Sequence, residues 1–147
     1  MHRDLELDRS PTYQLWLATN AWQRDVRRKL DPLGLTHVQF VVLASAMRLC
    51  HTEECLTQAK VSRLAELDEN MTSQVIRVLE RRGWVIRVKH PTDRRAHRIE
   101  LTDSGIKLAM AARTLVKEAA ERFFEPLGDR REEFVDALRT LNAHAAG

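Results

Sequence analysis

The sequence predicts a mostly α-helical protein with one small β-hairpin, built as a single domain over residues 1–147. Three observations predict this fold class. Apolar residues recur at helical spacing in several segments, the 147 residues include only five Gly and four Pro, and two short segments alternate apolar and polar residues. With 31% charged and 44% apolar residues, the composition is that of a soluble globular protein with one sizeable core.

Two helices are predicted before the middle of the chain. The first runs from Pro11 to Leu30, because proline suits a helix start and the Asp31–Gly34 segment contains the residues that end one. Thr36 is a plausible N-cap for the second helix, residues 36–49. Since this second helix is apolar nearly all round, we expect it to be buried on most sides.

The next two helices are short and closely spaced. Thr57 is predicted to cap the third helix, and Asn70 to cap the fourth, Met71–Arg82, which Gly83 ends. A turn of three or four residues between two short helices predicts a helix-turn-helix motif.

Two strands and two longer helices complete the predicted fold. Residues 84–89 and 97–101 alternate apolar and polar side chains and are predicted to pair as a hairpin. Thr102 is predicted to cap a helix over 103–124, and a last helix is expected over 130–143. At 1.5 Å per residue the helix over 103–124 would be about 33 Å long.

Positive charge is concentrated in one stretch of the chain. Residues 71–98 carry eight Lys/Arg and two Asp/Glu, whereas the other 119 residues carry sixteen basic and nineteen acidic side chains. Charge segregated in this way indicates a polyanionic partner.

The fourth predicted helix has the side chains for reading DNA bases. When Met71 is placed on the inner face, the residues expected to pack inward are Met71, Val75, Val78 and Leu79. The residues predicted to contact DNA are Thr72, Ser73, Gln74, Ile76, Arg77 and Arg81. Thr72 and the helix N-terminal amides suit phosphate, Arg suits guanine, Gln suits adenine and Ile suits the thymine methyl group. Glu80 is expected to be a spacer or to pair with Arg77 or Arg81, and an ordinary solvated helix face is the alternative.

The loop 90–96 between the strands is long and basic. Arg94 and Arg95 are predicted to reach into a minor groove, where negative potential is enhanced, and Asp93 is predicted to hold a neighbouring Arg in position. A β-turn with solvated charges is the alternative interpretation.

At these residues the chain resembles the multiple-antibiotic-resistance regulator (MarR) family of winged-helix transcription factors. The residues that carry the resemblance are Leu35-Thr36, Gln39-Phe40, Val75-Ile76-Arg77, Leu79 to Val85, Asp93-Arg94-Arg95 and Leu101 to Gly105. The resemblance covers about residues 13–143 with the same order of elements.

The resemblance implies a homodimer that binds a palindromic double-stranded DNA operator. It implies a winged helix-turn-helix lobe over 36–102, with the helix over 71–82 in the major groove and the wing, 90–96, in the minor groove. Residues 11–31 and 103–146 would supply the dimerisation helices. Arg95 would correspond to the wing-tip arginine and Asp93 to the acid that orients it. Repression in this family is usually relieved by a small ligand, often an aromatic or phenolic acid, or by cysteine oxidation.

The helices that flank the lobe contain more apolar surface than a small lobe can bury, which also predicts a dimer. These apolar residues are Tyr13, Leu15, Trp16, Trp22, Leu115, Val116, Phe123, Phe124, Phe134, Leu138 and Leu141.

Two groups of residues are candidates for sensing a signal. Trp16, Trp22, His37 and Phe40 could line an effector cleft, although packing of both Trp in the core or the dimer explains them equally simply. Cys50, His51 and Cys55 could sense an oxidant or bind a metal. Since no second ligand pair accompanies these cysteines, structural cysteines are favoured and no metal site or cofactor is predicted.

Other classes of protein fit the sequence less well. The chain has no Gly-rich phosphate loop, no Gly-x-Ser-x-Gly and no His-Glu-x-x-His, so we do not expect an enzyme. A winged-helix module that binds protein instead of DNA is an alternative, which the basic loop disfavours. With no signal-peptide core and no span-length apolar run, we expect a cytoplasmic protein without membrane contact.

Overall fold

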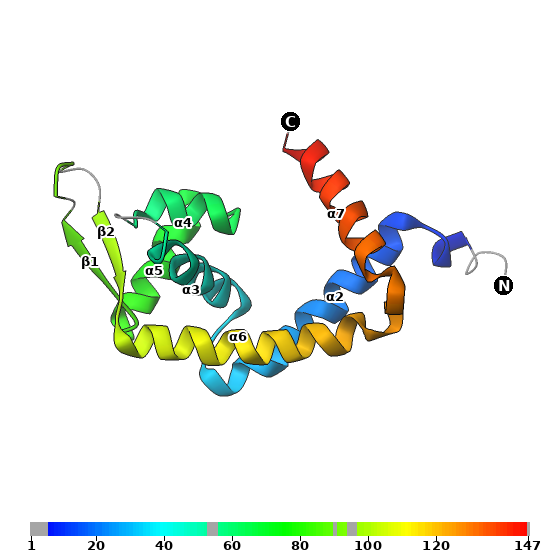
Figure 1. Ribbon diagram of the computed structural model, residues 1–147, viewed down its shortest axis with the longest axis horizontal. Helices are drawn as coiled ribbons and strands as arrows, with labels where there is room; N and C mark the ends of the chain where they lie inside the picture. Colours follow the sequence, from blue (N-terminus) through cyan, green and yellow to red (C-terminus); the bar gives the residue numbers. More distant parts are fainter. Residues whose placement is uncertain (1–5, 53–55, 90, 94–96, 147) are drawn as a thin grey trace.

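The computed structural model describes residues 6–52, 56–89, 91–93 and 97–146. Its elements are α2 (Pro11–Leu30), η1 (Asp31–Leu33), α3 (His37–Cys50), α4 (Gln58–Ala65), α5 (Glu69–Arg81), β1 (Val85–Lys89), β2 (His97–Leu101), α6 (Asp103–Phe124), η2 (Glu125–Arg130) and α7 (Arg131–Ala145). The predicted mostly helical fold with one β-hairpin is confirmed (Figure 1).

One lobe of the molecule contains α3, α4, α5 and the hairpin (Figure 1). β1 and β2 are antiparallel, with Val85 opposite Leu101 and Lys89 opposite His97. The chain before α4 also pairs with β2, because the Ile99 amide donates to the Leu56 carbonyl at 2.7 Å. This extra pairing ties the base of the hairpin to the helices of the lobe.

α6 is the longest helix and links the two ends of the molecule. It starts at the base of the hairpin and runs to the end of the molecule where η2 leads into α7, with α2 alongside it (Figure 1). At the far end, Trp22 of α2 packs on Phe123 and Phe124 of α6, with ring centroids 5.5 and 6.0 Å apart. Phe134 of α7 joins this cluster, 5.8 Å from Phe124.

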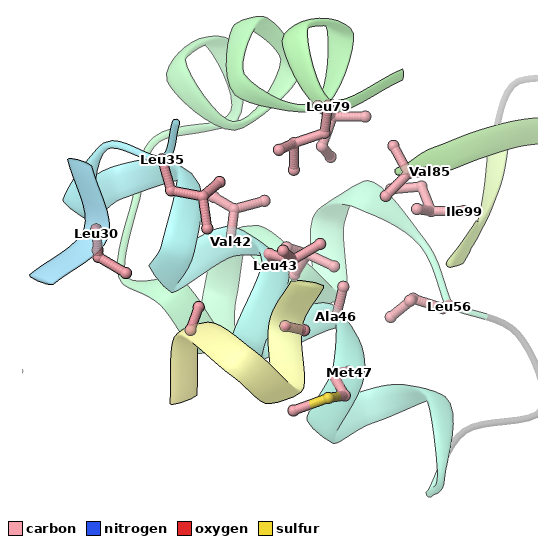
Figure 2. Close-up of a cluster of buried hydrophobic side chains, with 14 of the residues drawn as sticks. Leu30, Leu35, Val42, Leu43, Ala46, Met47, Leu56, Leu79, Val85 and Ile99 are labelled. Carbon is pink, nitrogen blue, oxygen red and sulfur yellow. The ribbon is translucent and has the colours of Figure 1, made fainter. Parts of the chain in front are cut away.

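The hydrophobic core lies inside the lobe and extends to α2 and α6 (Figure 2). Leu43 of α3, Leu79 of α5 and Leu30 of α2 are fully buried. Val85 and Ile99 connect the hairpin to the same core. The hairpin is therefore packed on the helices at its base, not held by its strand pairing alone.

The start of α6 lies very close to the base of the hairpin. A Cβ atom at Gly105 would lie 2.0 Å from the Trp84 carbonyl oxygen, a contact that main-chain atoms cannot relieve. Thr102 strengthens this junction, because its hydroxyl donates to the Gly83 carbonyl at 2.7 Å and accepts from the Gly105 amide. Only glycine allows α6 to approach the hairpin this closely.

The predicted caps at Thr36, Thr57 and Thr102 are confirmed, but the cap predicted at Asn70 is wrong. The Asp68 carboxylate accepts a hydrogen bond from the Met71 amide at 2.7 Å, so α5 begins at Glu69.

No single helix in the described parts of the chain has the length and apolar character needed to cross a membrane. One bent pair there, Pro11–Leu33 with His37–Cys50 at 76°, meets that test by length and composition.

Candidate nucleic-acid interface

The solvent-facing side of α5 carries a row of polar and basic side chains. Asn70, Gln74, Arg77 and Arg81 are all exposed and follow each other at intervals of three or four residues, which places them on one face of the helix. Met71 is also exposed, at 43%. Within the described residues, the Arg77 and Arg81 side chains form no hydrogen bond or ion pair, so both guanidinium groups can reach a ligand.

The predicted DNA-facing roles of Thr72 and Ile76 are wrong, because both side chains lie in the core, at 0% and 1% exposure. The buried stripe of α5 is Thr72, Ile76 and Leu79, and Met71 lies outside it. Thr72 can occupy a core position because its hydroxyl donates to the Asp68 carbonyl at 2.9 Å. The sequence-based assignment of faces treated Met71 as an inward residue and so rotated the helix by about one residue.

Ser73 is half-buried and its carbonyl accepts a hydrogen bond from Arg87 at 3.4 Å. Glu80 pairs with the same Arg87, at 3.8 Å, and not with Arg77 or Arg81 as predicted. Sequence reasoning missed Arg87 as part of this surface, as well as Asn70 and Met71. With Asp68 recognised as the N-cap, Asn70 falls inside the helix and joins the polar row that ends at Arg81.

The start of α5 is acidic. The Met71 amide already donates to Asp68, and Glu69 is exposed in the first turn. The prediction that the N-terminal amides of this helix receive phosphate therefore does not fit the structure, because a carboxylate occupies that position.

The hairpin rises from the lobe on the side of α5 (Figure 1). Lys89 at the end of β1 is exposed, as are Pro91, Thr92 and Asp93. Arg94 and Arg95, the predicted minor-groove residues, lie outside the described residues, so their assignment stays a prediction.

A groove with a volume of about 910 Å³ lies between α3 and α6. Its walls are Phe40, Ala44, Met47, Ile106 and Met110, and its polar groups are Arg48, His51 and Arg113. Apolar walls with a few polar groups are typical of sites for small organic ligands.

Only Phe40 of the predicted effector residues lines this groove. Trp16 is 66% exposed on α2, and Trp22 lies in the aromatic cluster. His37 packs edge-on against Trp22 at 6.4 Å, and burial lowers the pKa of its imidazole. The prediction that these four residues share one cleft is therefore wrong, because Trp22 and His37 pack at the junction of α2 and α3.

Cys50 is exposed at the end of α3, where its thiol donates to the Met47 carbonyl at 2.9 Å. His51 is exposed beside it, whereas Cys55 lies outside the described residues. In the part of the chain that the structure describes, no three His, Cys, Asp or Glu side chains are grouped to hold a metal ion.

Comparison with known proteins identifies the family. The MarR family model matches residues 35–97. The uncharacterized HTH-type transcriptional regulator YdcH of Bacillus subtilis (strain 168) is 36% identical over 135 residues, which cover 92% of this chain and 91% of YdcH. The fold and its outward-facing helix are those of a winged helix-turn-helix regulator, and the chain belongs to the MarR family.

Two solved structures are similar over nearly the whole chain. CouR from Rhodococcus jostii RHA1 bound to p-coumaroyl-CoA has 29% identity and a TM-score of 0.78, covering 92% of this chain and 93% of that chain. The transcriptional repressor CouR bound to a 23-mer DNA duplex has 29% identity and a TM-score of 0.77, covering 97% and 96%.

Proposed function

We propose that this protein is a transcriptional repressor that binds a palindromic DNA operator as a homodimer and releases it when a small ligand binds. The observation that carries the proposal is the exposed row Asn70, Gln74, Arg77 and Arg81 on α5, next to a hairpin with a basic loop. The structural relative CouR has been solved on a DNA duplex, which supports the same kind of partner here.

In this proposal α5 is the recognition helix and enters the major groove. Arg77 and Gln74 read base edges, since Arg can bond guanine and Gln can bond adenine through two atoms each. Arg81 contacts backbone phosphate further along the groove. The hairpin forms the wing, and Arg94 and Arg95 at its tip enter the minor groove.

The homodimer is proposed from apolar surface on α2 and α7. Trp16 and Leu15 are 66% and 56% exposed, and Leu141 of α7 is 60% exposed. Phe134 and Val135 of α7 are also exposed, at 36% and 47%. We propose that these side chains of α2 and α7 belong to one interface, because large exposed apolar areas usually mark interfaces. A two-fold dimer would present two recognition helices to half-sites about one DNA turn apart, about 34–36 Å.

The groove between α3 and α6 is the proposed effector site. Arg48 and Arg113 beside the apolar walls suit an aromatic or phenolic ligand with a negative charge. CouR has been solved with p-coumaroyl-CoA, a phenolic thioester, which supports this class of ligand. The proposed function involves no catalytic step. Because a bacterial transcriptional regulator binds the chromosome, we also propose that the protein acts in the cytoplasm.

Fluorescence anisotropy with labelled DNA tests the proposal. At low salt the protein should bind a random duplex, and selection from a random duplex pool should yield a palindrome bound at least about a thousandfold more tightly. Arg77→Ala should weaken binding to the selected palindrome by about tenfold or more, with a smaller effect on random duplex, because a base contact is lost.

Arg28→Ala is the matched control, because Arg28 on α2 has a side chain that is 79% exposed and lies outside the lobe. This control should bind both duplexes as the native protein does. Absence of duplex binding at low salt, together with normal folding, would reject the regulator and favour a protein-binding winged helix.

A further inference from the structure

We propose that Arg87 is a positioning residue that fixes the wing against the recognition helix, so that the protein can discriminate between DNA sequences. The proposal rests on the proposed DNA-binding function and adds a residue to it. Arg87 belongs to β1 of the wing, but both of its polar partners belong to α5.

Arg87 lies in the middle of β1, opposite Ile99 of β2. Its side chain is only 21% exposed, in contrast to the freely accessible Arg77. Nη2 donates to the Ser73 carbonyl at 3.4 Å, and Nε lies 3.8 Å from Oε2 of Glu80. The guanidinium group therefore lies along the side of the recognition helix.

Ser73 and Glu80 are seven residues apart, which is about two helical turns or about 10 Å. One guanidinium group thus contacts α5 at two positions that are about two turns apart. Nε is buried and forms no hydrogen bond, so the charge of Arg87 is balanced mainly by Glu80. Removing the Glu80 carboxylate would leave the part-buried guanidinium group of Arg87 without its counter-charge, which is unfavourable.

This arrangement matters because the helix and the wing enter different grooves of one duplex. Contacts to base edges require side chains held to within about 0.5 Å, and such precision depends on supporting bonds. Phosphate contacts tolerate small displacements, because they act largely through charge. Loosening the wing against α5 should therefore reduce sequence discrimination more than it reduces general affinity for DNA.

The test compares binding to the duplex selected by the native protein with binding to a random duplex of equal length. Arg87→Gln should reduce the ratio of the two affinities by about tenfold, through weaker binding to the selected duplex. Glu80→Gln should have a similar effect, and the double variant should lose no more than either single variant. Arg87→Lys keeps the charge but cannot contact both turns, so it should restore discrimination only in part.

Lys89→Gln is the matched control, since it removes one exposed positive charge from the same strand. It should weaken binding to both duplexes by the same factor and lower the salt dependence. If Arg87→Gln behaves in this way, Arg87 is a phosphate contact and the proposal is wrong. Unchanged discrimination in Arg87→Gln, or additive effects in the double variant, would also overturn it.

Hydrogen exchange of the DNA-free protein provides a separate measurement. Arg87→Gln and Glu80→Gln should accelerate amide exchange in residues 85–101, whereas Lys89→Gln should not. Unchanged exchange in both variants would overturn the positioning role, whatever the DNA experiments give. If exchange rises but no duplex binds even the native protein, the proposed function fails while the contact between wing and helix stands.

Discussion

Ile76 and Arg77 are neighbours in α5 with opposite environments. Ile76 is 1% exposed and packs with Leu79 in the core, whereas Arg77 is exposed to solvent. Each of them therefore has one separable role, the first in folding and the second in the proposed reading of DNA.

Ile76→Ala should lower the free energy of unfolding by about 2–5 kcal/mol, because it removes buried methyl groups and leaves a cavity. Arg77→Ala should change that free energy by only about 0.5 kcal/mol or less, since its side chain is exposed. Urea denaturation followed by circular dichroism measures both. Equal destabilisation by the two substitutions would contradict the orientation of α5 described here.

Thr72 shows why the sequence predicted this face incorrectly. A polar residue was expected outside and Met71 inside, but the Asp68 carbonyl satisfies the Thr72 hydroxyl and makes its burial possible. Such a local hydrogen bond depends on where the helix begins, which polarity alone does not reveal.

At the scale of elements, the bounds of α2 and α6 were predicted closely because residues that start or end helices flank both of them. Pro11 starts α2, Thr102 caps α6, and both positions leave few alternatives. Asp68 and Asn70 lie close together at the start of α5 and either residue type can cap a helix, so the start was placed two residues too late. The groove proposed as the effector site was missed for another reason: its walls come from α3 and α6, which are distant in sequence.

The groove between α3 and α6 has the apolar walls and cationic side chains to bind a phenolic carboxylate. p-Coumarate, a phenolic carboxylate, should raise the melting temperature of the protein, because it binds only the folded state. Arg113→Gln should weaken this binding by about tenfold or more, since a charge-assisted bond is lost, but should not weaken binding of the neutral methyl ester.

Thermal shift and calorimetric titration measure these effects. Met110 lines the groove and is 59% exposed, so Met110→Glu places a negative charge in the groove and should abolish binding of the acid. Ile86→Glu serves as the control, because Ile86 is 44% exposed and does not line the groove. Equal binding of the acid by all variants would show that the ligand occupies another site.

For the whole molecule, the apolar side chains are divided between a buried core and an exposed set on the flanking helices. The lobe buries its own core, whereas Trp16 of α2 and Leu141 of α7 are exposed on helices that lie outside the lobe (Figure 1). The aromatic cluster of Trp22, Phe123 and Phe124 supports these helices from within the chain. The apolar residues expected at the interface are thus divided between internal packing and free surface, a division that sequence alone could not make.

Trp16→Glu and Leu141→Glu should each shift the protein from dimer to monomer, because a buried unpaired charge disfavours association. Sedimentation velocity at micromolar concentration measures the change. Ile86→Glu, on the wing, should leave the dimer intact. A dimer that persists in both of the first two variants would place the interface elsewhere.

α6 extends without interruption from the base of the wing to the aromatic cluster, over 22 residues and about 33 Å. Because an uninterrupted helix has a fixed length, a movement at one end of α6 tilts the whole helix and displaces the other end. A ligand bound in the groove beside α6 should therefore rotate the lobe of α3, α4, α5 and the hairpin relative to the proposed dimer interface. This rotation changes the distance between the two recognition helices. The effector concentration needed to release the operator should consequently differ between operators whose half-site spacing differs by one base pair.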